Sequence, residues 1–148
     1  MKSFILSCLL KLFPTKIAYA HCDVPCGIYD PKPAQIAAAT VYKMVQLIGE
    51  FPAQNPTVND RNKLIRCVLT KEEYAGKCKE EILILWTDYF KPEHLQMFPN
   101  LHDTFWKAAK LCSKNKQEVS IELAQELVKA VDEIAEIFQK AKAAASKK

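Results

Sequence analysis

Apolar residues recur every three or four positions in four long segments of the chain, and no segment shows the sustained alternation of a strand. This spacing is typical of amphipathic helices that bury one side against a shared core. The sequence therefore predicts four helices, at about residues 33–48, 60–90, 100–112 and 117–141.

The apolar face of each predicted helix identifies the residues expected in the core. In the first helix this face carries Ile36, Thr40, Met44, Leu47 and Ile48. In the second it carries Leu64, Val68, Ala75, Cys78, Ile82, Leu85 and Tyr89, with the spacing interrupted at Lys71. In the third it carries Leu101, Phe105, Ala109 and Cys112, and in the fourth Ile121, Ala124, Leu127 or Val128, Val131, Ile134, Phe138 and Ala141.

Short connections join these segments. Gly49 and Pro52 end the first helix, Pro92 ends the second, and residues 113–116 separate the third from the fourth. Connections this short place successive helices side by side and antiparallel. The predicted fold is all-α, an antiparallel up-and-down four-helix bundle, with a proline-containing segment before it that hangs outside as a hook.

Composition and charge bound the class of protein. At 148 residues, of which 49% are hydrophobic, the chain suits a single domain. Its formal net charge of +4 falls close to neutral once the three lysines of residues 1–20 are set aside, and no basic stripe with interleaved aromatic residues appears. Nucleic-acid binding is therefore not expected.

Residues 1–20 have the layout of a leader. A basic start precedes a short apolar run, and the triplet Ala18-Tyr19-Ala20 resembles a cleavage site. Lys11 and Lys16 interrupt the apolar core that a secretory signal needs, so a secretory signal and a non-secretory propeptide both stay open. The run is far shorter than the ~20 residues of a membrane span, and no stable membrane anchor is expected.

The cysteines do not form an obvious disulfide framework. Removal of the leader takes Cys8 with it and leaves an odd number at irregular spacing. Cys67, Cys78 and Cys112 lie among apolar neighbours at helical spacing, so we expect them to be small buried hydrophobic residues.

Cys22 and Cys26 are different, because cleavage after Ala20 would create a His21-Cys22 amino terminus. Such a terminus offers a metal ion an α-amine, an imidazole, a deprotonated amide and a thiolate, and Cys26 adds a second thiolate. Chelate rings through the amide favour a planar nitrogen and sulfur set, which suits nickel(II) or copper(II). Zinc stays an alternative on the Cys-x3-Cys spacing, although His94 and His102 lack the spacing to complete its site.

Two motifs in the chain resemble those of one family. The segment His21-Cys22-Asp23-Val24-Pro25-Cys26-Gly27-Ile28-Tyr29-Asp30-Pro31 closely resembles the nickel hook of nickel superoxide dismutase. The segment Leu85-Trp86-Thr87-Asp88-Tyr89-Phe90-Lys91-Pro92 resembles the second signature of that family. The resemblance covers essentially the whole chain and implies a leader at residues 1–20, a nickel-binding hook at 21–32 and a four-helix bundle at 33–148.

The resemblance also implies roles for particular residues. The His21 amine, the Cys22 amide and the thiolates of Cys22 and Cys26 would bind one nickel ion per chain, with the His21 imidazole as an axial ligand on oxidation. Tyr29 and Tyr89 would hydrogen-bond near the open axial face. Lys91 would place a positive charge near the entrance and favour an anionic substrate.

Two positions depart from the best-known branch of the family, in which a glutamate on the first helix and an arginine on the second orient the axial imidazole. The matching positions here are Ala37 and Tyr74. The partner of the His21 imidazole therefore stays unidentified.

The predicted function is that of a superoxide dismutase, which converts superoxide to dioxygen and hydrogen peroxide by cycling nickel between nickel(II) and nickel(III). The alternative is a non-enzymatic metal-binding or metal-delivery module that uses Cys22 and Cys26. The resemblance further implies a precursor cut by an N-terminal processing protease, a homohexamer, and a cytoplasmic location, with export the alternative if the leader acts as a signal peptide.

Overall fold

The computed structural model describes residues 28–52 and 54–145. Four long helices, α2 (Lys32–Gly49), α3 (Val58–Ile84), α5 (Leu101–Gln117) and α6 (Ile121–Ala145), make up most of this part of the chain. A π-helix, η1 (Leu85–Tyr89), extends α3, and the short helix α4 (His94–Met97) follows it. None of these helices is both long enough and apolar enough to cross a membrane.

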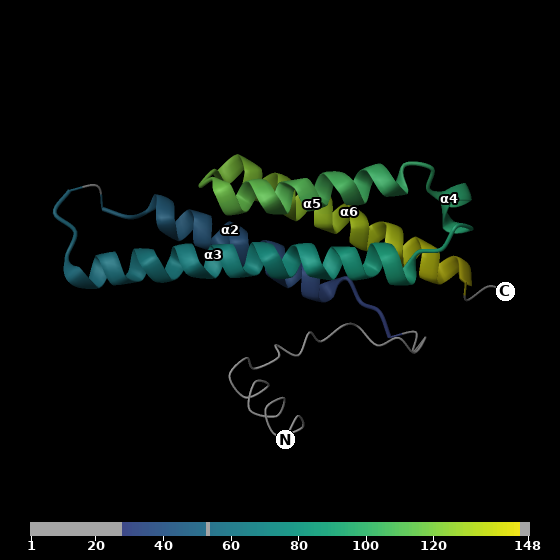
Figure 1. The fold of residues 1–148 in the computed structure, drawn as a ribbon, viewed down its shortest axis with the longest axis horizontal. Helices are drawn as coiled ribbons and strands as arrows, with labels where there is room; N and C mark the ends of the chain where they lie inside the picture. Colours follow the sequence, from purple (N-terminus) through teal and green to yellow (C-terminus); the bar gives the residue numbers. More distant parts are fainter. Residues whose placement is uncertain (1–27, 53, 146–148) are drawn as a thin grey trace, which may run out of the picture.

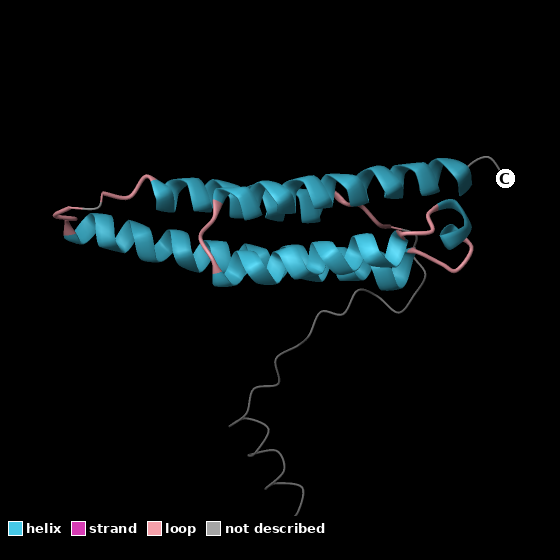
Figure 2. Cartoon of the chain, turned by 90° about the horizontal axis from the view of Figure 1, so that it is seen from above, coloured by secondary structure: helices cyan, strands magenta, loops and turns pink. Residues whose placement is uncertain are grey.

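The four long helices run alternately in opposite directions around one core (Figure 1). Helices α2 and α6 form one layer and α3 and α5 the other (Figure 2), and α2 also packs against α3 while α5 packs against α6. Each long helix therefore has two neighbours. Within the described ranges no strand occurs, and the predicted all-α, up-and-down four-helix fold is confirmed.

The core agrees with the predicted faces on α5 and α6 but not on α2. The buried residues of α2 are Ala34, Ala37, Ala38, Val41 and Val45. Ile36, which was expected in the core, is 53% exposed, and Met44, Leu47 and Ile48 are only half-buried. The prediction followed the largest side chains, whereas α2 turns its small residues toward α3 and α6.

Lys71 is buried, at 2% exposure, although the sequence pattern placed it at an interruption of the apolar face. Its ammonium group donates hydrogen bonds to the carbonyls of Asn115, Lys116 at 2.9 Å and Glu118 at 3.2 Å. These carbonyls lie at the C-terminal end of α5, where backbone acceptors have no partner within the helix. Lys71 thus binds the end of α5, which continues through the break predicted at residues 113–116.

The start of α3 is fixed by a capping box. The Thr57 hydroxyl accepts a hydrogen bond from the Asp60 amide at 3.1 Å, and the Asp60 carboxylate accepts one from the Thr57 amide at 2.9 Å. Two backbone donors that a helix start leaves unpaired are satisfied in this way. The Thr57 hydroxyl also donates to the Asp60 carboxylate at 2.7 Å, and this bond, followed by the one from the Thr57 amide, lowers the pKa of Asp60.

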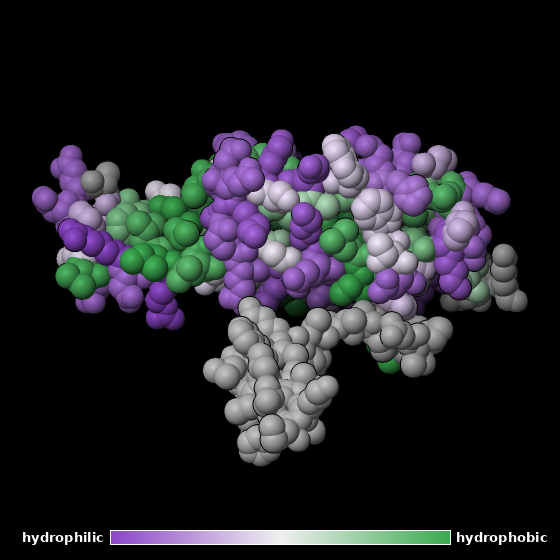
Figure 3. Space-filling model, in the orientation of Figure 1, coloured by the Kyte–Doolittle hydropathy of each residue, from purple (hydrophilic) through white to green (hydrophobic). Residues whose placement is uncertain are grey.

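The N-terminal half of α3 extends beyond the ends of α5 and α6 (Figure 1), because α3 is much the longer of the two helices in its layer. Three large apolar residues on this overhang are exposed: Val58 at 80%, Ile65 at 58% and Leu69 at 62%. They recur at helical spacing, and the same end of the molecule is largely apolar at its surface (Figure 3). We call Val58, Ile65 and Leu69 the overhang stripe.

Candidate metal centre

The candidate metal ligands His21, Cys22 and Cys26 lie outside the described residues, as does the leader at 1–20. In the part of the chain that the structure describes, no group of three or more His, Cys, Asp or Glu residues is placed to hold a metal ion. Cys67, Cys78 and Cys112 are buried free thiols, as predicted. A metal centre made from three such side chains would therefore need residues of the hook.

The end of the hook is held against the second motif. The Tyr29 ring lies against the Tyr89 ring, with centroids 5.5 Å apart and planes inclined at 58°. One residue further on, the Asp30 carboxylate accepts a hydrogen bond from the Lys32 amide at 2.8 Å and so stabilises the first turn of α2. The two motifs, which are distant in the sequence, therefore meet at one end of the bundle.

Tyr89 is surrounded by aromatic rings from three parts of the fold. Phe138 of α6 lies closest, with ring centroids 4.4 Å apart, and Phe90 packs edge-on at 5.0 Å. The ring of His94 stacks parallel to Tyr89 at 5.9 Å. Burial raises the pKa of Tyr89 above its ordinary value of 10.0, so at neutral pH the phenol keeps its proton and can donate a hydrogen bond.

The second motif forms a π-turn rather than the continuous α-helix that was predicted. The Phe90 amide closes this turn by donating to the Leu85 carbonyl at 3.2 Å. A π-turn accommodates one more residue than an α-turn and changes the directions of the side chains that follow, and such turns occur frequently at functional sites. Here Leu85 and Phe90 are buried in the core, while Tyr89 lies half-exposed between them.

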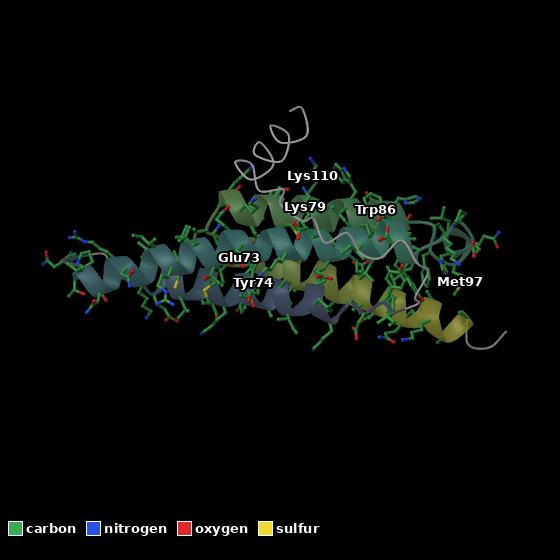
Figure 4. The ribbon with its side chains drawn as sticks, turned by 60° about the horizontal axis from the view of Figure 1, so that its bottom comes forward. Glu73, Tyr74, Lys79, Trp86, Met97 and Lys110 are labelled. Carbon is green, nitrogen blue, oxygen red and sulfur yellow. The ribbon has the colours of Figure 1, made fainter. Side chains whose placement is uncertain are left out.

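Trp86 closes the side of η1 that faces α5. Its ring stacks on Phe105 with centroids 5.8 Å apart, and its indole N–H donates to Nδ1 of His102 at 2.8 Å. In Figure 4, Trp86 and Met97 mark the end of the bundle at which η1 and α4 lie. Trp86 therefore fixes η1 to the core, as a packing residue.

Lys91 is exposed and follows Tyr89 by two residues. Its amide donates to Nδ1 of His94 at 2.9 Å, and its carbonyl accepts from the His94 amide at 2.9 Å. Pro92 occupies the second position of this four-residue turn, where its fixed φ is favourable. The backbone that carries the Lys91 ammonium group is therefore held at both its amide and its carbonyl.

Neither position that departs from the family motif supplies a charged partner. Ala37 is 3% exposed and belongs to the core face of α2. Tyr74 is half-buried on α3, and the Lys77 ammonium lies 4.6 Å from the centroid of its ring. A carboxylate and a guanidinium that would orient the imidazole are thus absent from these two positions.

The structure adds two residues to the site that sequence reasoning missed. Phe138 was predicted only as a core residue of the fourth helix, because its contact with Tyr89 depends on tertiary packing. His94 was rejected as a zinc ligand, and its contacts with Tyr89 and Lys91 were not predicted. The sequence feature that could have pointed to His94 is its position in the turn directly after the second motif.

The chemistry of the hook fits nickel. An amine, an amide nitrogen and two thiolates are strong donors that favour a tetragonal site, whereas a structural zinc site usually draws four side chains into a tetrahedron. The free thiols of Cys67, Cys78 and Cys112 are buried in the bundle and do not extend this donor set. The fold is that of a helical-bundle protein, and the motifs predict a metal hook at its amino terminus.

Comparison with known proteins gives the family. A family model described as nickel-containing superoxide dismutase matches residues 16–142. The superoxide dismutases (Ni) of Streptomyces seoulensis and Streptomyces coelicolor are each 36% identical to the chain over 137 residues, which cover 92% of this chain and 99% of each relative.

Comparison with solved structures identifies the same family. The native structure of nickel superoxide dismutase matches with a TM-score of 0.71 and 32% identity, covering 82% of this chain and 99% of that one. A structure with the nickel ligation of the oxidized state gives a TM-score of 0.71 and 34% identity, with 82% and 98% covered. The chain belongs to the nickel-containing superoxide dismutase family, and the predicted enzyme class and nickel cofactor are confirmed at the level of that family.

Proposed function

We propose that the chain is made as a precursor, is cut after Ala20, and then acts as a superoxide dismutase with one nickel ion held by its new amino terminus. The His21 amine, the Cys22 amide and the thiolates of Cys22 and Cys26 would hold the ion, and the His21 imidazole would be a further ligand. Residues 1–20 are the leader, 21–32 the hook and 33–148 the bundle.

The contact between Tyr29 and Tyr89 is the observation that supports this proposal most strongly. Tyr29 is three positions after Cys26, so chain connectivity alone limits the distance between their Cα atoms to about 11 Å. A metal ion held by Cys26 would therefore lie in the neighbourhood of the second motif. The family resemblance and the packing of the described residues point to the same end of the bundle.

When bound, the nickel ion supplies a one-electron couple in reach of superoxide, because two thiolates and an amide stabilise its higher oxidation state. The protein residues supply hydrogen bonds, control access to the site and deliver protons. The Tyr89 phenol, which its raised pKa keeps protonated, would be available to donate a hydrogen bond at the site. The Tyr29 and Tyr89 rings restrict the approach to small molecules, and Tyr29, the hook amides and water are the proton sources for peroxide.

Lys91 serves the encounter with the substrate. Superoxide is an anion, and a positive charge near the entrance raises its local concentration and its rate of association. Lys91 is exposed and lies two residues after Tyr89. Its backbone amide is held by the hydrogen bond to His94. The increase in association rate that Lys91 provides should become smaller as added salt screens its charge.

The partners of the chain follow from the same proposal. A processing protease that cleaves after Ala20 is required, and we place the enzyme in the cytoplasm, with export if the leader acts as a signal peptide.

A homohexamer is supported by the overhang stripe, since exposed apolar residues at helical spacing are typical of surfaces that associate. Ile65→Glu combined with Leu69→Glu should reduce the mass measured by light scattering if this surface joins subunits.

Three versions of the chain test the ligand set. One is the full chain, one begins at His21, and the matched control begins at Ala20 and so differs from the second by a single residue. Only in the version that begins at His21 is the His21 nitrogen a primary amine. We expect nickel binding and superoxide dismutation in that version and little of either in the other two; equal activity in all three would contradict the ligand set.

A further inference from the structure

The ring of His94 contacts three consecutive residues of the second motif. Its ring stacks on Tyr89 with centroids 5.9 Å apart and planes inclined at 10°, and it meets the Phe90 ring at 5.5 Å and 83°. Its Nδ1 accepts the hydrogen bond from the Lys91 amide at 2.9 Å. Tyr89 and Lys91 are the two residues of this motif to which the proposed function assigns a role.

The hydrogen bond to Lys91 requires Nδ1 to be unprotonated, since a protonated ring nitrogen can only donate. The His94 amide also donates to the Lys91 carbonyl, so both the amide and the carbonyl of Lys91 are hydrogen-bonded to His94. Pro92, inside the turn, has no amide hydrogen, and it restricts the residue before it to extended conformations. Pro92 and the two bonds to His94 therefore fix the backbone of Lys91 together.

The stacking contact acts on Tyr89 in a different way. Phe138 and Tyr29 pack against the phenol ring, and the parallel ring of His94 provides a further aromatic contact. His94 itself is half-buried and is not among the residues of the hydrophobic core. Its replacement should therefore cost the bundle little while leaving Tyr89 freer to move.

We propose that His94 is a positioning residue for superoxide dismutation, which holds the Tyr89 phenol and the Lys91 backbone in a fixed relation. This proposal rests on the proposed function. The imidazole does both tasks with one group: its face orients the phenol and its Nδ1 orients the lysine. In this proposal His94 acts only through Tyr89 and Lys91.

Two variants separate the two tasks. His94→Gln can still accept the Lys91 amide bond but has no ring, and His94→Phe keeps a ring for Tyr89 but has no acceptor. Because small misplacements of reacting groups are costly, we expect kcat/KM to fall about tenfold in His94→Ala and by a smaller factor in each of the other two. His102→Gln is the matched control, since His102 accepts a hydrogen bond from Trp86 and not from Lys91.

Amide hydrogen exchange gives a readout that does not depend on activity. The Lys91 amide should be protected in the parent protein and in His94→Gln and should exchange quickly in His94→Phe. The expected result is this pattern together with reduced kcat/KM, parental nickel content, a melting temperature close to that of the parent, and parental behaviour of His102→Gln.

Parental kcat/KM in His94→Ala would overturn the proposal, and so would a loss of activity that only follows a loss of nickel or of folded protein. Failure of the proposed function is a separate result, because it would appear as an inactive parent protein. In that case the exchange measurement still tests whether His94 holds Lys91.

Discussion

Replacing Lys71 with methionine should destabilise the bundle by about 3 kcal/mol. The Lys71 side chain is almost completely buried, and its ammonium group donates to three carbonyls at the C-terminal end of α5. Methionine preserves much of the volume of lysine but cannot donate a hydrogen bond. The substitution therefore removes the donor while every acceptor stays in place.

The magnitude follows from opposing effects. A hydrogen bond to a charged group contributes about 1.5–3 kcal/mol, and a buried carbonyl without a donor costs about 1–3 kcal/mol. Lys116 and Glu118 are exposed residues, so water can replace the ammonium group at their carbonyls, whereas Asn115 is fully buried. Methionine also avoids the cost of burying a charge, which offsets part of the loss.

Urea unfolding followed by circular dichroism, at equal nickel content in variant and parent, measures the effect. In a thermal scan the same loss should lower Tm by roughly 6–12 °C. Lys77→Met is the matched control, because Lys77 pairs with Glu73 at 2.6 Å on the surface and an exposed pair contributes little. If the two variants lose equally little stability, the bonds from Lys71 do not stabilise the fold and this reasoning is wrong.

Three further predictions concern other parts of the fold. Phe138→Leu should cost about 1–2 kcal/mol in chemical unfolding and lower kcat/KM, because the ring packed on Tyr89 is lost; parental kcat/KM would show that Tyr89 does not need this support. Thr57→Ala should cost about 1 kcal/mol through loss of the α3 cap. The Thr57 hydroxyl lowers the pKa of Asp60, so its bond to the carboxylate stabilises the fold above pH 3.8, and this part is lost as the pH falls through the lowered pKa; the difference between parent and variant should therefore narrow in acid. The hydrogen bond with Cys112, together with burial, raises the pKa of Cys78, so a thiol reagent should leave Cys78 unmodified in the native protein and modify it in urea, and rapid reaction under native conditions would contradict its burial.

Helical periodicity was sufficient to predict the four long helices, their order and the buried faces of α5 and α6, but not the short helix α4 or the π-helix η1. It failed on α2, where Ala34, Ala37 and Ala38 are buried and Ile36 is exposed. Helices that pack closely bury small side chains, and a pattern weighted by side-chain size does not detect this. Lys71 was interpreted as an interruption of the apolar face. Its burial could not be predicted from local spacing, because the carbonyls that accept its hydrogen bonds belong to a helix that is distant in the sequence.

The candidate site was predictable as a set of residue types but not as an arrangement. The resemblance of the two motifs to those of the family identified Tyr29, Tyr89 and Lys91. The π-turn at Leu85–Tyr89, the Phe138 ring and the bond between Lys91 and His94 depend on packing between helices and on a local departure from α-helical hydrogen bonding. None of these leaves a periodic signal in the sequence.

The central claim is that a primary amine at His21 completes a nickel site. Determination of the N-terminal residue and the metal content of the protein purified from its natural source tests this claim most directly. The account predicts a chain that begins at His21 and carries nickel in equimolar amount. A protein that retains residues 1–20, or that begins at His21 but holds zinc instead of nickel, would contradict it.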